Sequence, residues 1–474
     1  MKGEIIRFLN LNNMTAQFNN IARQLTSIAL ISVSLSLWPI QFAQSATSLE
    51  NSLVIVTSFT EKFFDHFRNA FQKDHPSVKV HILNKKTSAA ISYIQQRPLG
   101  SVDIFWASAP DAFEVLKQSK HLQKTGNLKR SAPNRLGGNP LDDPEGYYTG
   151  FAVSGYGIMW NENYLKKFGL PQPNRWDDLK KPVYHGHVGI TAPSRSGTTH
   201  LIVETILQTQ GWEKGWASLI GIGGNLATVT ARSFGVRDGV VSGRFGVGLV
   251  IDFFGLSSVA LKAPVGFIYT PESPLLPANI AMIKEAPHPN AAKAFINFLV
   301  SNEGQKILFD PFIRRLPVLR GVYNHAPEDY PNPFTQKLVD GELKYDRLLS
   351  RQRYHLVNVL FDRLITFRLK SLRETWRLLR QAETAAAESG SQELLDLAAQ
   401  ARKLISNVPV PESLSDDASF ASVFKRRKPG LPLPNRQVEL EEKWERSMRA
   451  NFVEIAQLTR QVIEAATKIK GGTP

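Results

Sequence analysis

The sequence predicts an α/β fold in two lobes, followed by a C-terminal region built only of helices. Short apolar strands alternate with amphipathic helices between about residues 50 and 335. Residues 146–161 read as one long strand that crosses from one lobe to the other. Beyond about residue 335 the strand patterns stop and apolar residues recur at helical spacing.

The expected boundaries follow this alternation, and 474 residues suffice for two or three domains. We expect a signal peptide at 1–46, the first part of lobe 1 at 50–150, lobe 2 at 151–270, a return to lobe 1 at 271–335, and a helical extension at 336–474.

The N-terminus predicts export. An apolar run at 25–40 follows Arg23 and precedes the small residues 43–46, which is the pattern of a cleavable signal peptide. Met14 could be the true start. The alternative is an uncleaved membrane anchor, but the run is short for a span and ends at Pro39. We therefore expect an exported protein.

Composition narrows the chemistry. The formal net charge is +15, which suits an acidic ligand or an anionic surface. Cysteine is absent, which excludes disulfides, thiol nucleophiles and cysteine-based metal sites. No histidine or carboxylate spacing indicates a metal site, so we expect no cofactor, and we expect no nucleic-acid partner.

In the first lobe, three strands each end in hydroxyl residues where a helix begins. Strands are expected at 53–56, 78–82 and 102–106, with helices from Glu61, Thr87 and Asp111. Phenylalanines recur at helical spacing after Glu61 and are expected in the core. The hydroxyl side chains at these junctions are Ser58, Thr87, Ser88 and Ser108.

The segment 193–200 follows an apolar strand at 188–191 and precedes a helix expected from Thr199. A helix N-terminus offers free N–H groups and a positive dipole to an anion. Gly197 allows close backbone approach, and Arg195 can grip a phosphate or carboxylate with two bonds. The hydroxyl donors here are Ser196, Thr198 and Thr199. A plain helix N-cap would use the same residue types.

These junctions are expected to meet, because ligands of open α/β sheets lie outside the carboxyl ends of the strands. Each hydroxyl alone could be a helix cap, but their repetition predicts an anion site between the lobes. No lysine follows Gly197 as in a P-loop, so nucleotide binding is not indicated.

The remaining elements complete the two lobes. Helices are expected at 163–168, 176–179, 212–219, 236–243, 290–299 and 303–308, a glycine-rich turn at 221–225, strands at 247–252, 265–269 and 278–283, and an extended segment at 316–318. The strand at 247–252 closes on Asp252, and Phe253 and Phe254 follow.

The extension is expected to form a helical hairpin or small bundle, with helices at 356–379, 392–405 and 438–469 and a loose loop at 409–434. Arginine is dense in the first of these helices, which would suit an anionic surface or simply a solvated face.

Several segments together resemble family 1 extracellular solute-binding proteins of ABC transporters, and most closely the phosphonate and phosphoglycerate branch. They are 53–59, 103–108, 193–200, 233–239 and 315–318, so the resemblance covers about 50–330. It implies a type 2 periplasmic-binding fold with the ligand held between two lobes. The C-terminal helices lie outside the family pattern.

The resemblance also bears on the ligand. Ferric-binding relatives use a tyrosine pair, and Phe253 and Phe254 stand at the matching place, which argues against iron. Asp252 would suit an ammonium, as in 2-aminoethylphosphonate, or could pair with Arg195 or Arg232. Phosphoglycerate and aminoethylphosphonate both remain open.

The expected function is periplasmic binding of a small phosphorylated or phosphonate organic anion, for uptake or signalling, rather than catalysis. The resemblance implies an inner-membrane permease or a sensor kinase as partner. One alternative is a secreted hydrolase acting on a phosphoester through a serine near His200, but no nucleophile elbow is present. A ferric-ion binding protein is a second alternative, and a membrane-associated scaffold built on the C-terminal helices is a third.

Overall fold

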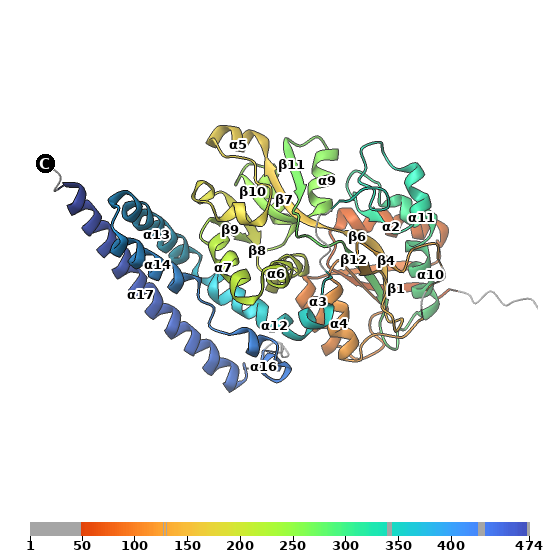
Figure 1. Ribbon diagram of the computed structural model, residues 1–474. Coiled ribbons are helices and arrows are strands. Elements are labelled where there is room, and N and C mark those ends of the chain that lie inside the picture. Colours follow the sequence, from red (N-terminus) through yellow and green to blue (C-terminus); the bar gives the residue numbers. More distant parts are fainter. Residues whose placement is uncertain (1–48, 127, 129, 339–343, 425–431, 472–474) are drawn as a thin grey trace, which may run out of the picture. The chain divides into compact units, whose positions relative to one another are not determined.

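The computed structural model describes residues 49–126, 128, 130–338, 344–424 and 432–471 and shows two β-sheets flanked by helices (Figure 1). The signal peptide expected at 1–46 lies outside the described residues. Across the described ranges, no helix combines the length and the apolar character needed to span a bilayer.

The first sheet has six strands in the order β13-β6-β12-β3-β1-β2. Their bounds are β1 (Ser52–Thr57), β2 (Lys79–Asn84), β3 (Ile104–Ala107), β6 (Thr149–Ser154), β12 (Leu276–Met282) and β13 (Leu316–Pro317). Helices α2 (Glu61–Asp74), α3 (Thr87–Gln96), α4 (Pro110–Gln118), α10 (Pro289–Leu299) and α11 (Asn302–Ile307) complete this lobe. The phenylalanines of α2 are buried as expected, with Phe63 and Phe67 packed on Trp106.

The second sheet has five strands in the order β11-β7-β10-β8-β9. Their bounds are β7 (Tyr156–Asn161), β8 (Val188–Thr191), β9 (Leu226–Thr230), β10 (Val247–Ile251) and β11 (Val265–Tyr269). Its helices are α5 (Glu162–Phe168), α6 (Gly197–Gln210), α7 (Trp212–Gly223), α8 (Phe234–Val241) and α9 (Asp252–Ala260), with a 3-10 turn η3 at Pro193–Arg195.

The predicted long strand is two strands that belong to different sheets. β6 ends at Ser154 and β7 begins at Tyr156, so the chain crosses between the lobes at Gly155. A Cβ atom at Gly155 would lie 2.7 Å from the Tyr269 ring, which explains why glycine stands there. The chain returns to the first sheet between β11 and β12. The fold is therefore two-lobed, as predicted.

The C-terminal region is helical, as predicted, with α12 (Arg347–Leu364), α13 (Leu369–Ser389), α14 (Gln392–Ser406), α15 (Glu412–Ser415), α16 (Ala418–Ser422) and α17 (Asn435–Gly471). α13, α14 and α17 pack against one another as a bundle that also contacts α7 (Figure 1). The single helix expected at 356–379 is broken at Ile365. The loop expected at 409–434 contains α15 and α16, and its residues 425–431 lie outside the described ones.

Other expectations about local structure were wrong in detail. β9 was not expected, because its sequence lacks a strong apolar alternation. Residues 221–223 continue α7 instead of forming a turn, and α6 begins at Gly197, two residues before the expected Thr199.

Candidate functional site

A cavity lies between the two lobes where the predicted hydroxyl residues meet. It is lined by Ser58, Phe59, Thr60, Phe63, Lys86, Thr87, Ser108, Arg195, Ser196, Thr198, Arg232, Ser233, Phe234, Phe253 and Phe254. Six of the ten residues predicted for the ligand site line it: Ser58, Thr87, Ser108, Arg195, Ser196 and Thr198.

The first-lobe wall is built at strand ends. β1 runs parallel to β3, so the carboxyl ends of both strands reach the same edge of the sheet. Ser58 follows β1 and Ser108 follows β3. Thr87 begins α3, directly after the neighbouring parallel strand β2. This is the convergence that the strand–hydroxyl–helix pattern predicts.

The second-lobe wall has the same construction. β8 is parallel to β9 and β10, and the segments that follow these three strands all reach the cavity. Arg195, Ser196 and Thr198 follow β8, while Arg232 follows β9 and Phe253 follows β10. Strand β9, which was not predicted, therefore places Arg232 at the cavity, and the site prediction did not include this cation.

The start of α6 is held by its own cap and by the opposite lobe. The Ser196 hydroxyl oxygen accepts a hydrogen bond from the Thr199 N–H at 3.2 Å, so Thr199 supports the cap and does not line the cavity. The Gly197 N–H donates to Thr87 Oγ1 at 3.2 Å. The Ser88 hydroxyl donates to the Ser194 carbonyl at 2.7 Å. Ser88 and Gly197 thus join the lobes beside the cavity.

Gly197 is needed for this close approach. A Cβ atom at Gly197 would lie 2.6 Å from Ala109 Cβ and 3.0 Å from Thr87 Cγ2, both in the first lobe. A further contact joins Arg232 Nη2 to Asn84 Oδ1 at 3.1 Å across the same gap. The lobes are therefore closed on one another in this structure.

The charge of the cavity favours an anion. Lys86, Arg195 and Arg232 line it, and no carboxylate is among its lining residues. Partial burial lowers the pKa of Arg232, yet an arginine remains protonated at neutral pH. Among the residues that the structure describes, no cluster of three histidine or carboxylate side chains could hold a metal ion.

Arg315 lies beneath the cavity and was not predicted as a site residue. It is fully buried, and its Nη2 donates to Ser108 Oγ at 2.5 Å. Its guanidinium carbon lies 4.2 Å from the centre of the Phe253 ring and 4.9 Å from that of Phe59. Burial lowers the pKa of Arg315 to about 10, so the buried group stays cationic at neutral pH.

Asp252 does not line the cavity, contrary to the prediction. It is fully buried at the crossing point between the lobes. Its carboxylate accepts hydrogen bonds from the Gly155 N–H at 2.8 Å, its neighbour Phe253 N–H at 2.7 Å and the Tyr269 hydroxyl at 3.1 Å. Burial raises its pKa to about 6, against the opposing effect of the Gly155 and Phe253 bonds and of Arg315. Asp252 thus stabilises the crossing and is not available to a ligand ammonium.

Two other residues are now placed. Phe253 and Phe254 line the cavity, and phenylalanine has no oxygen to coordinate a metal. His200, the histidine of the hydrolase alternative, is fully buried and contacts Asn358 and Ser350 of α12 instead of the cavity. His200 therefore cannot serve as a base for a serine in the cavity.

Comparisons with known proteins agree with this geometry. Residues 100–338 match the family model described as bacterial extracellular solute-binding protein. The phosphoglycerate transport regulatory protein PgtC of Salmonella typhimurium is 32% identical over 388 residues, which cover 81% of this chain and 92% of PgtC.

Two solved structures are similar in fold. The periplasmic binding protein AfuA of Actinobacillus pleuropneumoniae, with fructose-6-phosphate bound, gives a TM-score of 0.58 at 19% identity, covering 66% of this chain and 98% of AfuA. The apo ferric ion-binding protein A of Pasteurella haemolytica gives 0.54 at 17% identity, covering 66% of this chain and 97% of that protein. The family match, the PgtC similarity and the two-lobed fold with its interlobe cavity show that this chain belongs to the bacterial extracellular solute-binding proteins.

Proposed function

We propose that this protein binds a small phosphorylated organic acid of the phosphoglycerate type, in the periplasm, between its two lobes. One observation carries the proposal: hydroxyl groups from both lobes and three cationic side chains line one cavity that has no carboxylate in its lining. A phosphate with an attached carboxylate needs several donors and a positive field, and this cavity offers both.

The relatives support this ligand class. PgtC is named for phosphoglycerate transport, and AfuA is described with a sugar phosphate bound. The phosphonate alternative with an ammonium loses its motivation, because Asp252 is engaged with backbone N–H groups outside the cavity. An acid without an ammonium group therefore fits better than 2-aminoethylphosphonate.

The side chains have complementary roles in this proposal. Because Ser108 Oγ accepts a bond from Arg315, its own proton is free to be donated into the cavity. Arg195 forms no side-chain hydrogen bond or ion pair with another described residue, so its fork is available to a phosphate or carboxylate. Phe59 and Phe234 offer apolar surface to the carbon skeleton.

Binding would hold the lobes in the closed state, since Ser58 and Thr198 belong to opposite walls of the cavity. The closed form would then be recognised at the inner membrane by a permease or a sensor kinase. The two roles, uptake and regulation, need the same ligand-dependent closure.

Thermal-shift and calorimetric titration of the protein would test the ligand class. The panel contains 2- and 3-phosphoglycerate, phosphoenolpyruvate, 2-aminoethylphosphonate, inorganic phosphate and ferric citrate. We expect the phosphorylated carboxylic acids to raise the melting temperature and ferric iron to leave it unchanged. Tight binding of iron, or no response to any phosphorylated acid, would refute the proposal, and release of phosphate during incubation would revive the hydrolase alternative.

A further inference from the structure

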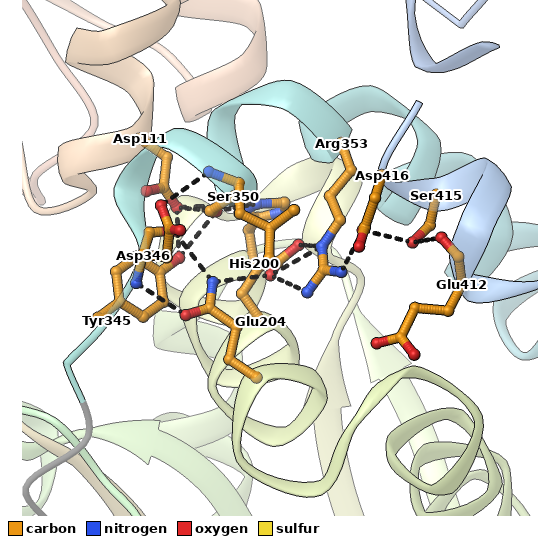
Figure 2. Close-up of polar contacts among 12 residues, drawn as sticks. Asp111, His200, Glu204, Tyr345, Asp346, Ser350, Arg353, Glu412, Ser415 and Asp416 are labelled. Atoms are coloured by element: carbon orange, nitrogen blue, oxygen red, sulfur yellow. Dashed lines mark hydrogen bonds and ion pairs between the residues drawn. The ribbon is translucent and has the colours of Figure 1, made fainter. Parts of the chain in front are cut away.

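Helix α12 contacts both lobes at once. It packs against α4 of the first lobe and against α6 and η3 of the second (Figure 1). The contacts are buried and polar, and Figure 2 shows side chains of the two lobes and of the C-terminal region pointing toward one another.

On the first-lobe side, the contacts converge on one carboxylate. Asp111, in the first turn of α4, is fully buried. Its Oδ2 accepts hydrogen bonds from the Ser350 hydroxyl and the Tyr345 hydroxyl, each at 2.9 Å. Arg347 adds a hydrogen bond to the Pro140 carbonyl of the same lobe.

On the second-lobe side, α12 is held by a buried ion pair and by a histidine. Arg353 donates to both oxygens of Glu204, with Nε–Oε1 at 3.1 Å and Nη2–Oε2 at 2.9 Å. His200 Nδ1 lies 3.0 Å from Asn358 Oδ1, and its Nε2 lies 3.3 Å from Ser350 Oγ. Ser350 thus touches Asp111 of one lobe and His200 of the other (Figure 2).

This cluster is one helical turn from the cavity on both sides. Asp111 comes three residues after Ser108 on the first wall. The His200 N–H donates to the Ser196 carbonyl at 3.0 Å on the second wall. If the lobes separate at the cavity, Asp111 and His200 separate too, and Ser350 cannot keep both contacts.

The second lobe holds the C-terminal region by more contacts than the first lobe does. The bundle packs on α7, the Trp212 indole N–H donates to the Val410 carbonyl at 2.6 Å, and Arg380 Nη1 donates to Asn225 Oδ1 at 2.7 Å. When the lobes open, the weaker connection, that between α12 and α4, should break first.

We propose that α12 is a closure-dependent strap: the C-terminal region moves with the second lobe and docks on Asp111 of the first lobe only when the cavity is closed. This rests on the proposed function only for the event that closes the lobes. Docking and ligand binding then strengthen each other by the same factor, because coupling between two sites is reciprocal. The position of the C-terminal helices relative to the first lobe becomes a readout of ligand occupancy for a membrane partner.

The similarity to PgtC extends into the C-terminal helices. The match to PgtC spans 388 residues, more than the chain has before its helical extension, so it must run into the C-terminal helices. A strap is therefore expected in PgtC.

The first test needs no ligand. Because the sequence contains no cysteine, spin labels attach only to the cysteines that are introduced. Spin labels on cysteines at the exposed residues Gln118 (first lobe), Asn163 (second lobe) and Val453 (C-terminal region) give three distances. Gly197→Val wedges the lobes apart. We expect the Gln118–Asn163 and Gln118–Val453 distances to lengthen and Asn163–Val453 to stay. Lengthening of Asn163–Val453, or no change in any distance, would overturn the proposal.

The second test measures the coupling with 3-phosphoglycerate as probe. Ser350→Ala removes the hydroxyl that joins both lobes, and we expect affinity to fall about three- to tenfold. Arg380→Gln, which disturbs only a second-lobe contact, should leave affinity within about twofold. Equal affinity in Ser350→Ala and in the unmodified protein would overturn the coupling. Absence of 3-phosphoglycerate binding in every form would count against the ligand class alone, because the distances above are measured without it.

Discussion

Arg315 Nη2 donates a hydrogen bond to Ser108 Oγ at 2.5 Å, directly beneath the interlobe cavity. The guanidinium is fully buried against the rings of Phe59, Phe63 and Phe253. Its Nε and Nη1 atoms have no hydrogen-bond partner in the described part of the chain. A buried cation of this kind orients the serine and contributes positive potential to whatever occupies the cavity.

The first prediction follows from this pair. Arg315→Met should weaken binding of 3-phosphoglycerate about tenfold, because Ser108 loses the bond that orients its hydroxyl toward the ligand. Titration calorimetry would measure the change. Since Arg315 acts largely through Ser108, the double variant with Ser108→Ala should lose less than the sum of the two single losses. Strictly additive losses would contradict this relationship, and Arg320→Met, which stacks on Phe334 away from the cavity, is the control.

The second prediction concerns the free guanidinium on the cavity wall. Arg195→Gln should reduce affinity for the same ligand by about tenfold or more, because it removes a charge-assisted hydrogen bond. The remaining affinity should depend less steeply on salt concentration. Lys85→Gln is a matched control, since Lys85 stacks on Tyr93 and does not line the cavity. Equal losses in both variants would indicate a general field effect in place of direct contact.

The third prediction concerns the buried ion pair between α6 and α12. Arg353→Met leaves Glu204 buried without its partner and should destabilise the protein by about 3–5 kcal/mol in chemical denaturation. Adding Glu204→Gln should recover much of that loss, because a neutral amide is cheaper to bury than an unpaired carboxylate. A double variant as unstable as Arg353→Met alone would show that packing, and not charge, dominates here.

The fourth prediction is a pH dependence. Burial raises the pKa of Asp111 to about 7 in the folded protein, from an ordinary value of 3.8. The folded state therefore binds the proton more tightly, so the contribution of Asp111 to stability is largest below about pH 4 and is lost as the pH rises to 7. Relative to Asp111→Asn, the free energy of unfolding of the unmodified protein should fall by on the order of 2–4 kcal/mol over that pH range.

Groups around Asp111 modify this behaviour. Glu204 raises its pKa, while Arg347 and the hydroxyls of Tyr345 and Ser350 lower it. Burial lowers the pKa of nearby His200 to about 4, so His200 contributes the opposite slope and destabilises the fold as the pH falls from 6.5 toward 4. Denaturation of both proteins at several pH values between about 4 and 8 isolates the Asp111 contribution. A constant difference across that range would contradict the prediction.

Local patterns were enough to predict most of the fold and six of the fifteen residues that line the candidate cavity. Strands that end at Ser58 or Ser108 and lead into helices predicted both the parallel sheet and the edge where a ligand would lie. Such patterns involve only residues that are close in sequence, so they can be recognised without knowledge of the tertiary structure. The crossing between the lobes within residues 146–161 was predicted, but its division into two strands at Gly155 was not. An apolar run does not show where one sheet ends and the next begins.

The errors in the site prediction arise from contacts between residues that are far apart in the sequence. Asp252 follows a strand of the second sheet like the true lining residues, but its hydrogen bonds come from Gly155 and Tyr269, which are distant in sequence. Arg315 lies in a short segment 207 residues after Ser108, and no local pattern links the two. The proposed role of α12 depends on Asp111 and His200, which lie 89 residues apart and belong to different lobes.

The polypeptide passes between the two halves of the molecule at Gly155, again before Leu276, and a third time through α12. In a protein whose lobes are connected by two strands alone, one lobe can unfold while the other stays folded. Such a protein would unfold in two thermal transitions. The third link ties both halves to the same helical segment, so neither should denature independently, and calorimetry should record a single cooperative transition.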